Sequence, residues 1–214
     1  MKVALIDSGS GNLRSAAKAI QRAADENTLT LDLKVTARVE DVVAADAIVL
    51  PGVGAFADCY RGLSSLDGMI AALNDQVITK AKPFLGICVG MQLMASVGRE
   101  HGEHKGLGWI DGAVELLTPA DKTLKIPHMG WNQLNLLQPG HPVLAGIAPG
   151  AHAYFVHSYH LVPRDRAAVL AEAEYGGPVV AAVQRNNMVG TQFHPEKSQA
   201  TGLRLLANFL RWRP

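Results

Sequence analysis

The chain has 214 residues, of which 48% are hydrophobic and 18% charged, enough apolar sequence for one sizeable buried core. Its formal net charge of +1 gives no electrostatic reason to expect binding to nucleic acid or to an anionic membrane. No apolar run reaches bilayer length, and the N-terminus has no signal-peptide pattern. The only two cysteines, Cys59 and Cys88, argue against a disulfide framework. We therefore expect one cytoplasmic domain over residues 1–214.

The first half of the chain alternates strand and helix patterns. Strands are expected over 3–6, 34–38, 47–50 and 83–87, and helices over 13–24, 69–80 and 91–95. Asn12 is in position to cap the first helix. This alternation is typical of a parallel sheet with right-handed crossovers. Sites in such sheets lie at the carboxyl ends of strands, which selects the loops after Ile6, Leu50 and Ile87.

The second half is richer in strands. They are expected over 114–117, 131–137, 154–162, 168–174, 179–185 and 188–193. Asn186-Asn187 is a good hairpin turn, and Leu203, Leu206 and Leu210 indicate a closing amphipathic helix. No linker is visible. We expect one mixed sheet whose second half is rich in strands, with a fourth candidate loop after Phe193.

The most informative motif is Gly86–Gly90, a G-x-C-x-G sequence between an expected strand and an expected helix. This is the layout of a nucleophile elbow with cysteine in the place of serine. The glycines let a strained turn form, and the N-terminus of the following helix favours the thiolate of Cys88. A buried cysteine is more often inert, but the glycine context favours a nucleophile here.

A cysteine nucleophile needs a base, and His194 is the best placed of the eight histidines. It follows an apolar strand, and Pro195 biases it toward an extended conformation. Residues two apart in an extended segment point the same way, so Glu196 is expected to accept the second N–H of the imidazole. The alternative is a hydrogen-bonded surface histidine.

The other histidines do not have metal-ligand spacing. His101 and His104 flank a glycine in what is expected to be an exposed loop. His152, His157 and His160 are interpreted as strand and loop residues. We expect no metal and no cofactor.

An oxyanion hole is also needed. Pro51–Gly54 follows a strand, and its glycines would let backbone N–H groups turn toward a developing oxyanion, although an ordinary turn is an alternative. The N–H of Val89 is the expected second donor. Gly9–Gly11 is not a dinucleotide fingerprint, because Arg14 stands where the third glycine belongs. Cys59 has no elbow glycines and is interpreted as a core residue.

The two triad motifs together resemble the class I, or triad, glutamine amidotransferases. The stretches that carry this resemblance are Gly86–Gln92 and Gln192–Glu196. Further stretches are similar to the glutaminase subunits of imidazole glycerol phosphate synthases: Gly9–Ser15, Pro127–Asn132, Tyr154–Tyr159 and Pro195–Ser198. The resemblance covers essentially the whole chain. Ser8 departs from it, because tyrosine is common there, and this affects local packing rather than the chemistry.

The resemblance implies a single-domain α/β protein with a flavodoxin-like, three-layer fold around a central mixed, mostly parallel sheet. It implies Cys88 as nucleophile, His194 as base and then acid, and Glu196 as the group that orients His194. Further roles are implied for Gly52, Val53, Gly54 and Val89 in the oxyanion hole, for Asn12, Gln92, Ser158 and Tyr159 in glutamine binding, and for Trp131, Asn132 and Lys197 at a partner interface.

Simpler roles remain open for several of these residues. Asn12 could be only a helix cap, Gln92 part of a polar helix face, Trp131 a core residue and Lys197 a solvated lysine.

The implied partner is a (β/α)₈-barrel cyclase in a heterodimer that makes imidazole glycerol phosphate and AICAR in histidine biosynthesis. Ammonia would pass to it through the protein interior, since it is a nucleophile only while unprotonated. We expect the chain to be largely idle alone, with the Gly52–Val53 peptide flipping on activation. Two other hypotheses remain open: a self-sufficient hydrolase with the same triad, and a non-catalytic interaction module.

Overall fold

An eight-stranded mixed sheet runs through the computed structural model, which describes residues 1–214. Its order is β2-β1-β3-β4-β14-β13-β12-β9, and the first five strands are parallel. The strands are β1 Lys2–Ile6, β2 Asp32–Thr36, β3 Ala47–Gly52, β4 Phe84–Cys88, β9 Asn135–Leu136, β12 Val169–Glu174, β13 Pro178–Arg185 and β14 Met188–Thr191. The predicted mixed, mostly parallel central sheet is therefore confirmed.

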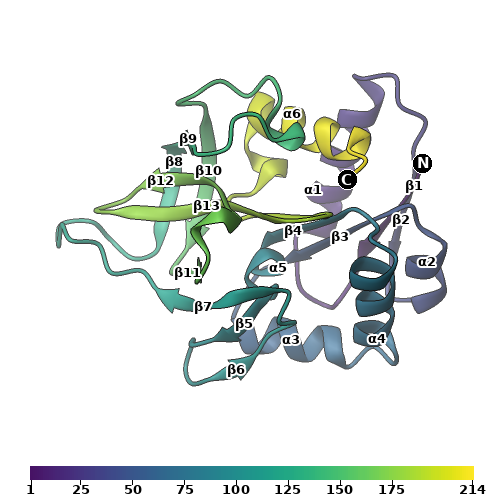
Figure 1. Ribbon diagram of the computed structural model, residues 1–214, viewed down its shortest axis with the longest axis horizontal. Coiled ribbons are helices and arrows are strands. Elements are labelled where there is room, and N and C mark those ends of the chain that lie inside the picture. Colours follow the sequence, from purple (N-terminus) through teal and green to yellow (C-terminus); the bar gives the residue numbers. More distant parts are fainter.

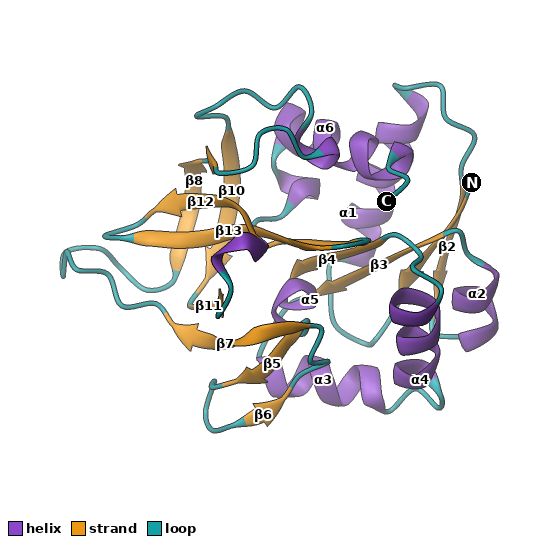
Figure 2. Ribbon diagram, viewed as in Figure 1, coloured by secondary structure: helices purple, strands orange, loops and turns teal.

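Helices cover both faces of the parallel part of this sheet and give three layers (Figure 1). One face carries α1 (Leu13–Asp25) and the C-terminal α6 (Gln199–Arg211), which pack on each other. The other face carries α2 (Val39–Ala44), α3 (Phe56–Ser64) and α4 (Met69–Leu73). The strand-rich remainder extends to one side, as the colouring by secondary structure shows (Figure 2).

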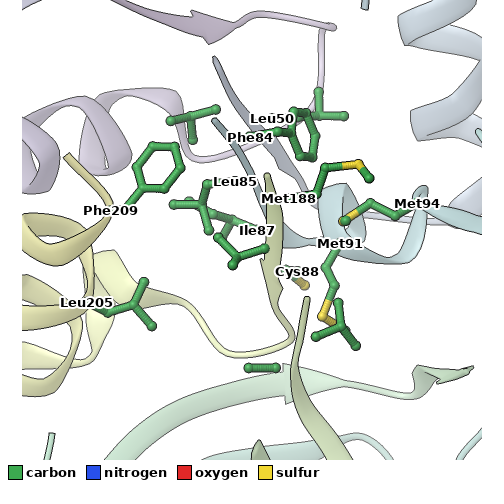
Figure 3. Packing of buried hydrophobic residues seen from close by; sticks show 14 of the residues in the cluster. Leu50, Phe84, Leu85, Ile87, Cys88, Met91, Met94, Met188, Leu205 and Phe209 are labelled. Carbon is green, nitrogen blue, oxygen red and sulfur yellow. The ribbon is translucent and has the colours of Figure 1, made fainter. Parts of the chain in front are cut away.

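The core lies between these layers. The strands β3 and β4 are buried on both faces and read as continuous apolar runs, which is typical of parallel strands covered by helices. Leu205 and Phe209 of α6 reach the sheet on one side, and Met91 and Met94 lie on the other side beside Cys88 (Figure 3). Burial of each such side chain stabilises the fold by about 1.5–3 kcal/mol, so this packing holds β4 and its carboxyl end firmly in place.

Only part of the strand-rich half joins the central sheet, so the expectation of one sheet was wrong. Two further sheets are present. One joins β5 Ala95–Gly98, β6 His104–Lys105, β7 Ile110–Leu116 and β11 Tyr159–Pro163, and the other pairs β8 His128–Gln133 with β10 His152–His157. The expected strand 154–162 is broken at Ser158, because its two halves pair with different sheets. The expected strand 131–137 likewise divides into β8 and β9.

Other boundaries also differ. Helix α5 covers only Val89–Gln92, since the Met94 and Ala95 carbonyls accept bonds from residues 108–110 instead of continuing a helix. The expected helix 69–80 is α4 followed by a π-helical turn, η1 (Asn74–Thr79). The short helices α2 and α3 were not foreseen. Three 3₁₀ turns complete the chain: η2 Pro142–Leu144, η3 Arg166–Ala168 and η4 Pro195–Lys197.

The strand order brings four candidate loops to one edge. The loops after β1, β3, β4 and β14 follow strands that are direct neighbours in the sheet. The Asn186-Asn187 hairpin between β13 and β14 is confirmed, with Asn186 at φ 52°. It reverses the chain so that β14 lies parallel to β4 and delivers the residues after Phe193 beside Cys88. None of the helices is both long and apolar enough to cross a membrane.

Candidate active site

The predicted elbow is present, and its strain is on the cysteine itself. Cys88 ends β4 with φ 55° and ψ −112°, a conformation that a non-glycine residue rarely adopts. Gly86 and Gly90 are needed for space rather than for positive φ. A Cβ on Gly90 would lie 1.8 Å from the Leu50 carbonyl oxygen, and one on Gly86 would lie 2.6 Å from the Gly90 carbonyl oxygen. Tight packing therefore fixes the strained turn.

The helix after the elbow is a single turn, so its macrodipole is smaller than the sequence interpretation assumed. Helix α5 instead supplies the backbone N–H groups of its first turn, which have no hydrogen-bond acceptor within the helix. Val89 is the first of these residues, and it lines the cavity next to Cys88.

His194 and Glu196 are in contact: Nδ1 of His194 lies 2.8 Å from Oε1 of Glu196, and both side chains are almost fully buried. The geometry behind this contact differs from the predicted one. His194 is extended, but Pro195 starts the 3₁₀ turn η4, which swings Glu196 back toward the imidazole. The backbone N–H of His194 donates to the Tyr154 carbonyl, and the Ser198 hydroxyl donates to the His194 carbonyl. These bonds hold the imidazole in place.

The charge of His194 follows from these neighbours. Burial by itself lowers the pKa of His194, but the interactions with Cys88 and Glu196 outweigh burial and raise that pKa to about 9. Its Nε2 is buried and has no other hydrogen-bond partner in the chain. The structure thus brings together a strained cysteine, an imidazole favoured in its charged form, and a buried carboxylate.

Cys88 and His194 line one cavity of about 450 Å³, whereas Glu196 is not among its lining residues. The cavity is lined by Val53, Gly54, Cys88, Val89, Gln92, Glu100, Pro127, Val156, His157, Ser158, Tyr159, His194 and Lys197. Of the residues expected to bind substrate, Gln92, Ser158 and Tyr159 lie here. Asn12 does not: it is exposed, outside the cavity, and although it occupies the N-cap position of α1 its side chain makes no capping bond.

The expected oxyanion loop lies beside the nucleophile. Val53 and Gly54 line the cavity, and Gly54 has φ +102°, which favours glycine. Gly52 does not line it; a Cβ there would lie 2.9 Å from the Gly90 nitrogen, so Gly52 allows β3 to pack against the elbow. The thiol of Cys59 donates to the Val53 carbonyl over 3.3 Å. Cys59, expected to be an inert core residue, therefore holds this loop.

Two polar residues in the site were not foreseen. Glu100 lines the cavity, and its Oε2 accepts the Phe56 N–H at 2.7 Å. Gln192 is fully buried: its Nε2 lies 3.7 Å from the Cys88 sulfur, and its Oε1 accepts from Gln92 Nε2 at 3.1 Å. Gln192 belongs to the motif that ends in Glu196, so its closeness to His194 in the sequence could have indicated that it lies in the site. No sequence signal indicated Glu100, because it reaches the cavity from a loop twelve residues after Cys88.

The expected interface residues differ in orientation. Trp131 is 47% exposed and packs edge-on against Tyr154, and Lys197 Nζ lies 5.6 Å from the centre of the same Tyr154 ring. Met129, also on β8, is 65% exposed. Asn132 instead turns inward, and its amide donates to the Glu174 carbonyl at 2.9 Å. Trp131 and Lys197 therefore form an accessible patch next to the cavity, and Asn132 does not face it.

The family of this fold and site is defined by comparison with known proteins. The family model of class-I glutamine amidotransferases matches residues 4–212. The chain belongs to this family. Among solved structures, one titled glutamine amidotransferase aligns over 98% of this chain and 97% of its own, with a TM-score of 0.72 at 18% identity. A glutamine amidotransferase from Thermotoga maritima has a TM-score of 0.64 at 18% identity, over 95% of this chain and 80% of its own. At these identities the likeness shows the fold alone.

The sequence relatives are more specific. Imidazole glycerol phosphate synthase subunit HisH of Rhodospirillum rubrum is 63% identical over the full length of both chains. The proteins of the same name from Brucella suis and Mesorhizobium japonicum are 57% and 58% identical, again over both full lengths.

Proposed function

We propose that this chain hydrolyses glutamine to glutamate and ammonia, with Cys88, His194 and Glu196 as its catalytic triad. The observation that carries the proposal is the strained Cys88 beside His194 at one cavity, with the other imidazole nitrogen of His194 held by the buried Glu196. Family membership and the names of its relatives support the same chemistry.

In the first step, the Cys88 thiolate attacks the side-chain carboxamide of glutamine. His194, charged because its pKa is raised to about 9, protonates the departing nitrogen so that ammonia leaves. A γ-glutamyl thioester remains on Cys88. His194, now neutral, takes a proton from water, the hydroxide attacks the thioester, and glutamate leaves with the thiolate restored. Glu196 keeps one imidazole orientation throughout, because it is bonded to Nδ1.

The tetrahedral intermediates carry a negative oxygen, which needs preorganised donors. The Val89 N–H, at the start of α5, is one such donor. The loop of Val53 and Gly54 supplies the other, with the Gly52–Val53 peptide able to turn its N–H toward the cavity. Loss of one such donor typically slows the reaction by about 10²- to 10³-fold.

The cavity also fits the two ends of an α-amino acid. The Glu100 carboxylate offers a negative group for the ammonium of glutamine. Ser158 lies in the break between β10 and β11 and lines the cavity. Its N–H donates to no backbone carbonyl, and we assign it as the donor for the carboxylate of glutamine. Gln92 Nε2 donates both of its hydrogens, one to the Tyr159 carbonyl and one to Gln192 Oε1. The Oε1 of Gln92 therefore remains as an acceptor for a substrate N–H. Asn12, outside the cavity, has no role in this binding.

We further propose that the ammonia passes to a (β/α)₈-barrel cyclase, with which this chain forms a heterodimer in the cytoplasm. The cyclase makes imidazole glycerol phosphate and AICAR. The patch of Met129, Trp131 and Lys197 beside the cavity is suited to such a partner, since exposed apolar groups with a rim charge are typical of protein interfaces. Delivery through the interface keeps ammonia unprotonated.

The test measures glutamate formation by the chain alone and with the cyclase and a cyclase ligand bound. We expect low activity alone, strong activation in the complex, and glutamine-dependent formation of imidazole glycerol phosphate. Cys88→Ser should bind glutamine and barely turn over, and His152→Gln, at an exposed position, is the control. Equal rates with and without the cyclase would favour a self-sufficient hydrolase. Undiminished activity of Cys88→Ala would refute the triad.

A further inference from the structure

A second group of buried polar residues reaches the cavity through His157 and is not part of the triad. His128 on β8 and His157 on β10 are cross-strand partners, and Nδ1 of His128 lies 3.1 Å from Nε2 of His157. Nε2 of His128 lies 3.2 Å from Nδ2 of Asn132, and Nδ1 of His157 lies 2.9 Å from the Tyr159 carbonyl oxygen. His128 and Asn132 share one face of β8 because they are four residues apart, and Gly130 between them has no side chain.

The direction of every bond in this chain is fixed from its two ends. At one end, Asn132 donates its Nδ2 to the Glu174 carbonyl, while its Oδ1 accepts the Gln133 N–H, so Nδ2 must donate to His128 as well. At the other end, a backbone carbonyl can only accept, so Nδ1 of His157 carries its proton. Nε2 of His157 is then an acceptor, and Nδ1 of His128 must be the donor.

The environment keeps both imidazoles neutral. His128 is stacked between Phe155 and Tyr175, with ring centres 4.7 and 4.0 Å away. Burial lowers the pKa of His128 to about 4 and that of His157 to about 3, and His160 and His194 are the other titratable groups that lower the pKa of His157. No carboxylate contacts either ring.

We propose that His128 and His157, each locked as the neutral Nδ1–H tautomer, are positioning residues that fix the wall against which glutamine binds. The wall is the break at Ser158, where β10 ends in one sheet and β11 begins in another. His157 bridges this break, because its side chain bonds the carbonyl of Tyr159 two residues on. That the bound ligand is glutamine rests on the proposed function, whereas the assignment of the two tautomers is independent of it.

The same carbonyl connects the histidines to the nucleophile. Tyr159 O also accepts from Gln92 Nε2 at 2.9 Å, so both of its lone pairs are used. Gln92 in turn donates to Gln192, which reaches Cys88. A shift of the Tyr159 carbonyl would release the Gln92 amide and move the Oε1 that faces the substrate. We therefore expect loss of His157 to weaken glutamine binding more than it slows the chemical step.

The direct test is ¹⁵N NMR of the imidazole nitrogens in the full-length wild-type chain at pH 7. Both His128 and His157 should be neutral Nδ1–H tautomers, although a free imidazole favours Nε2–H. His141 is an internal control with the opposite assignment, because its Nδ1 accepts the Val143 N–H. An Nε2–H tautomer or a charged ring at either position would overturn the proposal.

Kinetics of the partner-bound protein test the role in binding. His157→Leu removes the bond to Tyr159, and we expect the KM for glutamine to rise about tenfold with a smaller change in kcat. His157→Asn keeps a donor at the δ position and should restore most of the KM. An unchanged KM in a folded His157→Leu would refute the positioning role. Both histidines as Nδ1–H in a wild-type protein without glutaminase activity would instead refute the proposed function and leave the tautomers supported.

Discussion

Two histidine clusters meet at the same cavity, one through His194 and the other through His157, and they have opposite charge preferences. His194 and His128 are equally buried, each with 2% of its surface exposed. The pKa of His194 is nevertheless raised to about 9, while burial lowers the pKa of His128 to about 4. The difference lies in their partners, because His194 has a carboxylate and a thiol, and His128 has only neutral groups. Burial disfavours the charged form of both imidazoles, and only neighbouring groups that interact with the charge can outweigh this effect.

The clusters also differ in origin. His194 follows a strand of the parallel core, at the edge where functional loops of such sheets meet. His128 and His157 come from a separate two-stranded sheet, and we propose that they hold the backbone of the cavity wall in place. In our proposals, one fold supplies a charged histidine for chemistry and neutral ones for positioning.

Removing the carboxylate from the first cluster should have the largest effect. Glu196→Gln abolishes the charge that raises the pKa of His194 and allows the wrong tautomer, so we expect kcat for glutamine to fall by about 10³- to 10⁴-fold. NMR titration should show the pKa of His194 falling as well. Glu103→Gln, an exposed carboxylate paired with Arg99, is the matched control. If kcat changed equally little in both variants, Glu196 would not orient the base.

Acid should destabilise the protein through the second cluster. His128 and His157 are neutral when folded but take up protons near pH 6.5 when unfolded, so stability is lost as pH falls below 6.5 toward about 4 and about 3. Each contributes up to about 1.4 kcal/mol per pH unit. Urea unfolding at pH 6.5, 5.5 and 4.5 measures this. His157→Asn, with one buried imidazole fewer, should decline less steeply; identical slopes would contradict the neutral assignment.

Alkali should act on the first cluster with the opposite sign. The pKa of His194 is raised, so its stabilising contribution is complete below pH 6.5 and is lost as pH rises through about 9. The difference in unfolding free energy between wild type and His194→Gln should therefore shrink between pH 6.5 and 9.5, by on the order of 3 kcal/mol. His152→Gln serves as the control, and a gap that stays constant would mean that His194 is not charged when folded.

The smallest effect is expected at Cys59, the buried sulfur away from the charged pair. Burial raises the pKa of Cys59, which keeps it a neutral thiol that donates to Val53. Cys59→Ala removes one weak bond from the oxyanion loop, so kcat should fall by only about threefold. In the wild type, a glutamine-like electrophile should label Cys88 and leave Cys59 free in the mass spectrum. Preferential labelling of Cys59 would reverse the assignment of the nucleophile.

The sequence predicted the parallel half of the fold well, because apolar runs such as 47–50 and 83–87 are long enough to be recognised one at a time. It failed at residues 95–98 and at Ser158, where neighbouring backbone rather than local preference decides the pairing. The contact between His194 and Glu196 was predicted for the wrong reason, since a 3₁₀ turn creates it. The place of Glu100 and the inward turn of Asn132 gave no local signal.

What the sequence by itself determined is the chemistry that local motifs encode: a cysteine between close-packed glycines, a His-Pro-Glu segment after a buried strand, and a sheet with parallel order at its centre. Only the tertiary structure decided which histidines are charged. The charge of each ring depends on which groups from distant segments surround it. The spacing of residues along the chain does not predict those contacts, because they are made between different sheets.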